Sequence, residues 1–108
     1  MTISNYLEDI IINHLLRNGA FTPPATVYAS LHTADPGETG ASEVTGGSYA
    51  RQAVTLTAAS GGATSNSAIV DYVSMPAATV TFAGLWDAVS AGNFLWGGAL
   101  TASKTTNA

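Results

Sequence analysis

A pair of prolines divides this sequence into two kinds of hydrophobic pattern, and that change constrains the fold more than any other feature. Before Pro23 and Pro24, apolar residues recur every three or four positions, as they do on one face of a helix. After them, apolar and polar residues alternate, as they do in strands that bury one face. Because proline cannot continue a helix, the two patterns belong to different elements. We therefore expect one N-terminal helix followed by a series of strands.

The segment "SNYLEDIIINHLLR", residues 4–17, is the one convincing helix. Its apolar stripe, which we expect to face the rest of the protein, consists of Leu7, Ile10, Ile11, His14 and Leu15. Ser4 or Asn5 can cap the first amides, and the Asn18-Gly19 pair can end the helix in a left-handed conformation. Ile12 and Leu16 fall off the stripe, so we expect a second partner, such as another subunit, to cover them.

Five later segments show the alternating pattern of strands. They are residues 26–33, 50–58, 67–76, 78–88 and 92–100. Gly and Ser/Thr clusters separate them at the short, regular spacing of antiparallel sandwiches and barrels. The predicted fold class is mainly β, an antiparallel, jelly-roll-like β-sandwich preceded by one N-terminal α-helix.

The length of 108 residues is that of one domain with a modest core. We expect a single domain over residues 1–108, with the helix in residues 1–19 and the sandwich in residues 26–108. The sandwich includes a long loop at residues 34–50. The final "TASKTTNA" stands where one more strand is expected, so either an edge strand is missing or a neighbour supplies pairing there.

Charge limits the classes of partner. Charged residues make up 9% of the chain, against about 25% in an ordinary globular domain, and the net charge is −4. The only cations besides histidine are Arg17, Arg51 and Lys104, too few and too scattered to neutralise a row of phosphates. We therefore expect no nucleic-acid partner and no anionic membrane surface. Polar residues interrupt the N-terminal apolar stretch, which argues against a signal peptide or membrane span.

The polar surface must come mainly from Ser, Thr, Asn and backbone groups. Burial of such a surface costs little free energy, because few ions lose their hydration. This favours a chain whose surface ends up against other protein, although a secreted β-domain with a Thr/Ser-rich face would show the same composition. The absence of Cys excludes disulfides and thiolate sites.

The long loop contains the residues that a metal site would need. A calcium site there would draw its ligands from His32, Asp35, Glu38 and Glu43. These lack the regular spacing of oxygen ligands in an EF-hand loop. The Asp-Pro-Gly triplet at 35–37 is explained more simply as a turn, since Pro and Gly suit its central positions. We expect no metal ion.

Patterns for catalysis are equally weak. The Gly-Gly pair at 46–47 precedes a strand and has no Lys nearby, which excludes a phosphate loop. Ser48, His32 and Asp71 supply the residue types of a catalytic triad, but no Gly-x-Ser-x-Gly elbow occurs. Asp71 and Asp87 could pair as in a glycosidase, yet their flanks are typical of strand ends and turns. We expect neither an enzyme nor a cofactor.

Four residues are candidates for contacts with a partner through rings or charge. Trp86 and Trp96 flank an expected hairpin and either belong to the core, the simpler interpretation, or face outward. Outward rings would stack on sugars or hold a partner. Tyr49 and Arg51, at the end of the long loop, suit contacts with a neighbouring subunit. A wholly solvated, mobile loop is the alternative.

The block "TVYASLHTADPGETGASEVTGGSYARQAVTL" resembles a family of small structural proteins of tailed bacteriophages. The helical opening and the later "SNSAIVDY", "GLWDA", "GNFLWGGAL" and "TASKTTNA" extend the resemblance over nearly the whole chain. Members of the family are commonly labelled phage tail fibre proteins, and small β-sandwich proteins of this kind also serve as head decoration or cement.

The resemblance implies a virion structural protein made in the host cytoplasm. Our leading expectation is a capsid decoration or cement protein that stabilises the head through contacts between subunits. The alternatives are a tail-fibre or tail-tip component that contacts the host surface, and a carbohydrate-binding β-module. The expected partners are other virion proteins, either the major capsid protein or tail proteins, together with further copies of the chain. The expected interface residues are Ile12, Leu16, Tyr49, Arg51, Trp86 and Trp96.

Overall fold

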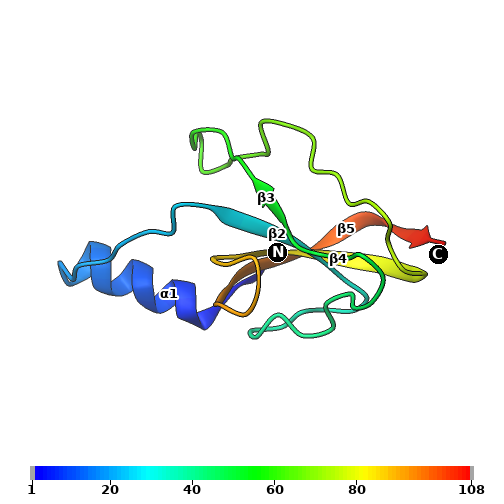
Figure 1. Ribbon diagram of the computed structural model, residues 1–108. Helices are drawn as coiled ribbons and strands as arrows, with labels where there is room; N and C mark the ends of the chain where they lie inside the picture. Colours follow the sequence, from blue (N-terminus) through cyan, green and yellow to red (C-terminus); the bar gives the residue numbers. More distant parts are fainter. Residues whose placement is uncertain (1, 108) are drawn as a thin grey trace.

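The computed structural model describes residues 2–107, and their strands form one antiparallel sheet (Figure 1). The strands are β1 (Thr2–Ile3), β2 (Val27–His32), β3 (Gln52–Val54), β4 (Ala78–Trp86) and β5 (Phe94–Thr106). Their order across the sheet is β1-β5-β4-β2-β3, which places β4 at the centre. The mainly β class with one N-terminal helix is confirmed. A second sheet, which a sandwich or jelly-roll requires, is not formed by residues 2–107.

The helix begins where the sequence indicates. α1 (Asn5–Ile11) continues without a break into a π-helical segment, η1 (Ile12–Leu16). The Ser4 hydroxyl caps the start by accepting a hydrogen bond from the Leu7 amide at 3.2 Å. No helix within residues 2–107 is long and apolar enough to cross a membrane.

The predicted burial of the helical stripe is largely wrong. Leu7 and Ile10 are half-buried, whereas Ile11 and Leu15 are exposed. The cause is the direction of the helix, which runs away from the sheet and leaves its second half without a surface to pack against (Figure 1).

Two of the five expected strands match closely, since β2 and β4 fall within residues 26–33 and 78–88. The other expectations need correction. The strand expected at 50–58 ends at Val54, and residues 67–76 form no strand. The stretch after residue 100, where a separate strand was expected, instead extends β5 to Thr106 opposite the start of β4.

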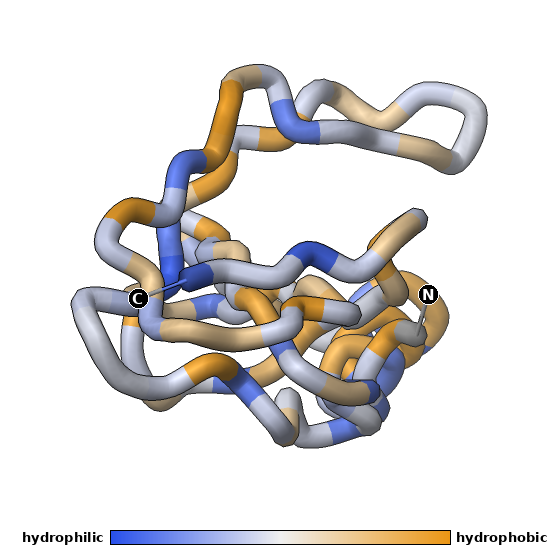
Figure 2. Tube along the Cα trace, turned by 90° about the vertical axis from the view of Figure 1, so that its right-hand side faces the viewer, coloured by the Kyte–Doolittle hydropathy of each residue, from blue (hydrophilic) through white to orange (hydrophobic). Residues whose placement is uncertain are grey.

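After β3 the chain leaves the sheet and forms a protruding hairpin, residues 55–67, which we call the hairpin arm (Figures 1 and 2). Its backbone hydrogen bonds run from Thr57 to Ser65 and from Ser67 to Thr55, each at 2.8 Å. The tip is a Gly-Gly pair with φ values of +60° and +78°, as a two-residue hairpin turn requires. The arm therefore accounts for the early end of β3.

The two faces of the sheet differ in an unexpected way. The alternation along β2 is confirmed, but its polar face is the buried one, since Ser30 and His32 are completely inaccessible to solvent. The long loop folds over this face, where Trp86, Phe94 and Val44 form most of the small core. The opposite, apolar face is only half covered. Its members are Ile3, Val27, Ala29, Leu31, Val54, Ala83, Leu85 and Trp96.

Candidate functional site

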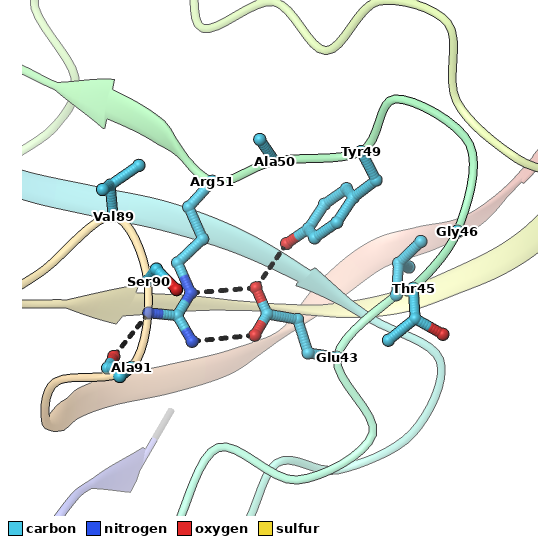
Figure 3. A pocket seen from close by; sticks show the side chains of 10 residues that line it. Glu43, Thr45, Gly46, Tyr49, Ala50, Arg51, Val89, Ser90 and Ala91 are labelled. Atoms are coloured by element: carbon cyan, nitrogen blue, oxygen red, sulfur yellow. Dashed lines mark hydrogen bonds and ion pairs between the residues drawn. The ribbon is translucent and has the colours of Figure 1, made fainter.

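The long loop is fixed to the sheet by an ion pair between Glu43 and Arg51 (Figure 3). The guanidinium donates two hydrogen bonds, Nε to Oε2 and Nη2 to Oε1, both at 2.9 Å. The Tyr49 hydroxyl donates a third hydrogen bond to the same carboxylate at 2.7 Å. The Arg51 and Glu43 side chains are only 8% and 20% exposed, so water screens this pair far less than a surface pair.

The same guanidinium also holds the turn between β4 and β5. Its Nη1 donates to the carbonyl oxygens of Ala88, at 3.1 Å, and Ala91, at 2.7 Å. Its central carbon lies 3.5 Å from the ring centroid of Trp86, a cation–π contact. Arg51 therefore joins three separate segments, and all of its charged nitrogens are in use.

A chain of hydrogen bonds continues beneath this ion pair. The indole of Trp86 donates to the Ser30 hydroxyl at 2.9 Å, and that hydroxyl lies 2.7 Å from Nε2 of His32. The other ring nitrogen, Nδ1, lies 2.8 Å from the carbonyl oxygen of Ala41, which can only accept. His32 therefore donates from Nδ1. The Ser30 oxygen already accepts from Trp86, and its own proton is available for Nε2, an arrangement in which the His32 ring is neutral.

The electrostatics agree with this assignment. Burial lowers the pKa of His32 from its ordinary value of 6.5, and this outweighs the opposing hydrogen bond to Ala41 and the Glu43 charge. Burial alone would raise the pKa of Glu43, but the hydrogen bonds from Arg51 and Tyr49 prevail and lower it. The cluster is thus an internal brace in which the charges of Glu43 and Arg51 are paired with each other.

The residues considered for calcium are each engaged elsewhere. The Asp35 carboxylate accepts a hydrogen bond from the Gly37 amide at 2.9 Å, which confirms the predicted turn. Glu38 accepts from the amide of Asn5 and thereby connects the loop to the start of the helix. His32 and Glu43 belong to the brace described above.

Five of the six predicted interface residues fall into two groups, and the sixth, Trp96, lies apart from both. Tyr49, Arg51 and Trp86 come together, but as internal contacts of the long loop, and Trp86 is only 7% exposed. A shallow depression beside them is lined by Glu43, Val44, Thr45, Gly46, Tyr49, Ala50, Arg51, Val89, Ser90 and Ala91 (Figure 3). Trp96, on the half-covered face of the sheet, is 38% exposed.

The second group is an exposed apolar surface on the helix. Ile12 is 48% and Leu16 79% exposed. Sequence reasoning missed that Leu15, at 69%, and Ile11 join them. We call these four residues the helix patch. The sequence pattern indicated only Ile12 and Leu16, because Ile11 and Leu15 belong to the stripe that would be buried on a helix lying against the sheet.

Comparison with known proteins identifies the family. The family model described as Podophage GP4 fiber I protein gp80 matches residues 2–108. A search of curated proteins found no match. The family match confirms the resemblance to phage fibre proteins, and a phage fibre family implies a component of the virion. This chain belongs to the podophage GP4 fiber I protein gp80 family.

Proposed function

We propose that this protein is a structural subunit of a phage tail fibre, which acts through contacts with further copies and with tail proteins rather than through catalysis. The observation that carries the proposal is the helix patch, because four large aliphatic side chains exposed together on a projecting helix need a protein surface to cover them. The family match favours a fibre over our first expectation, a capsid decoration or cement protein.

The half-covered face of the sheet supports the same proposal. Trp96 lies opposite Leu85 on β4, and Leu85 lies opposite Ala29 on β2, so an apolar band crosses three strands. Sheets bury such bands by packing face to face about 10 Å apart. In this proposal the sandwich expected from the sequence is completed between subunits, with the second layer supplied by a neighbour.

The helix patch is tested by the double substitution Ile12→Asp and Leu16→Asp. Both side chains are exposed in the single chain, so the variant should fold, with an unchanged circular dichroism spectrum. Burial of an uncompensated carboxylate in an interface is costly, so incorporation into particles should be lost. The matched control is Val89→Asp, at an exposed apolar position in the turn between β4 and β5. Full incorporation of the double variant would contradict the proposal.

Position and copy number in purified particles separate the fibre from the capsid alternative. A fibre subunit should be found at the tail, in roughly a few to tens of copies, because closed assemblies repeat a subunit only a few times. Hundreds of copies spread over the head would identify a decoration protein instead. The measurement is quantitative mass spectrometry of particles together with labelling in electron micrographs.

A carbohydrate-binding role has support only from Trp96. Its ring is partly exposed, whereas Trp86 lies beneath Arg51 and cannot reach a sugar. Binding on a glycan array that disappears with Trp96→Ala, in a variant that still folds, would support this role. An array without signal would contradict the carbohydrate-binding role and leave the proposed fibre role unaffected.

A further inference from the structure

The hairpin arm is the least supported part of the molecule. Every residue from 55 to 69 is exposed, and the hydrogen bonds of residues 55–68 all stay within that segment of the described chain. Figure 2 shows the arm at the top of the trace, separate from the body. An isolated two-stranded hairpin is marginally stable in water, so the arm needs another surface to hold it.

A matching surface is present at the outer edge of β5. The short strand β1 pairs with β5 only at Trp96 and Gly97. From residue 99 to 106 that edge has no strand partner within residues 2–107. The side chains at 101–105 are exposed on both faces of the strand. A long edge of this kind offers unpaired backbone N–H and C=O groups to an incoming strand.

The surface area indicates how much of the chain is left uncovered. A compact monomer of 10.9 kDa exposes about 5,600 Å². This chain exposes 6795 Å², so the excess is about 1,200 Å². Each partner in a typical stable complex contributes about 800 Å². The excess is therefore larger than the area that one chain contributes to a typical stable interface.

The distribution of charge supports a second copy as the partner. Two copies that each carry a net charge of −4 repel one another wherever their carboxylates face. All seven Asp and Glu residues lie outside the arm and outside β5. No charged residue occurs between Arg51 and Asp71, and β5 carries only Lys104. Copies can thus approach arm to edge without repulsion and with few ions to dehydrate.

We propose that the hairpin arm of one copy pairs with the outer edge of β5, residues 99–106, of a second copy. The arm adds its strands to the neighbour's sheet by backbone hydrogen bonding, as in other cases of β-strand addition. Donor and acceptor are different surfaces, so repetition generates a ring or a continuous row of subunits. The inference deepens the proposed fibre role, on which it rests, by naming the surfaces that join the copies.

The absence of cysteine in the sequence makes a direct test simple. Two single-cysteine chains of full length, Ser65→Cys in the arm and Ser103→Cys on β5, are mixed and cross-linked with a short bis-maleimide. One of the chains carries a tag that separates mixed from identical pairs. The control mixture pairs Ser65→Cys with Ser90→Cys. All three serines are exposed, so each introduced thiol is accessible to the reagent.

The arm–edge mixture should give the mixed cross-link on the order of tenfold faster than the control, because pairing raises the effective concentration of the two thiols. The difference should vanish in urea. Adding Thr57→Asp to the arm chain should also remove it, whereas adding Thr39→Asp in the exposed long loop should not. Equal rates in the arm–edge and control mixtures would overturn the inference.

The fibre role and the arm contact fail separately. A chain located in the tail that shows no preferential arm–edge cross-link overturns the arm contact and leaves the fibre role. A chain that cross-links as expected but is absent from tail fibres supports the arm contact and overturns the fibre role.

Discussion

Removal of the Arg51 charge should be one of the most damaging single changes in this chain. In Arg51→Met the aliphatic stem remains, but Glu43 keeps only the Tyr49 hydroxyl as a donor, and the carbonyls of Ala88 and Ala91 lose theirs. Removal of one partner from a buried ion pair costs about 3–5 kcal/mol. Because water still reaches the 20%-exposed Glu43 side chain, we expect the lower end, about 3 kcal/mol.

The assay is urea unfolding followed by tryptophan fluorescence at one fixed protein concentration. For a domain of this size, 3 kcal/mol corresponds to a shift of the midpoint by about 1.5 M. The control is Arg17→Met, an exposed arginine whose guanidinium contacts the Asn13 side chain at 3.3 Å, and it should cost less than about 0.5 kcal/mol.

A double-mutant cycle with Glu43→Gln isolates the interaction itself. Once the carboxylate is neutral, loss of Arg51 leaves no unpaired charge, so the double variant should be more stable than the sum of the two single effects implies. We expect a coupling of about 1.5–3 kcal/mol. If Arg51→Met costs under about 1 kcal/mol, no more than an ordinary surface ion pair, the argument for a buried brace is refuted.

Three further predictions concern the covered face of the sheet and the edge of β2. Acid should destabilise the fold, because the lowered pKa values of His32 and Glu43 mean that the unfolded chain binds more protons than the folded chain. The melting temperature should fall as the pH drops below 6.5, and fall further below 4.5. A melting temperature that stays constant from pH 7 to 4 would contradict this. Gly40→Ala should lower the free energy of unfolding by about 3 kcal/mol or more, because φ is +76° and a Cβ would lie closer than 3.0 Å to two aromatic rings. The control Gly37→Ala, at a φ of +61° with open space around it, should lower it by about 1 kcal/mol. Tyr72→Phe leaves the Ala29 carbonyl without its hydroxyl donor and should cost about 1–3 kcal/mol in the same urea assay.

The local sequence pattern correctly predicts those elements that depend only on neighbouring residues. The helix start at Ser4, the turn at residues 35–37 and the strands β2 and β4 follow from capping, turn preference and alternation. The stretch at 67–76 alternates in the same way yet forms no strand, because a strand also needs a partner edge. Beyond the short strand β3, side chains rather than a strand pair with the backbone of β2. The Tyr72 hydroxyl donates to the carbonyl of Ala29, and the Tyr49 hydroxyl accepts from the amide of Leu31.

The site was harder to predict, because its contacts join residues far apart in the sequence. Burial of Ser30 and His32 contradicts their polarity and becomes favourable only when Trp86 and Ala41 complete the hydrogen-bond chain. Residue type and position predict contacts with a partner for Tyr49, Arg51 and Trp86, whereas in the structure these side chains contact one another and the long loop of the same chain. Arg51 and Glu43 gave no sequence signal as a pair.

The dependence of stability on protein concentration tests the central claim, that copies of this chain complete one another, most directly. If neighbours cover the hairpin arm, the helix patch and the open face of the sheet, the melting temperature of the purified protein should rise steadily with concentration. Sedimentation over the same range should show assemblies larger than one chain. A single-chain species with the same melting temperature at every concentration would contradict the account.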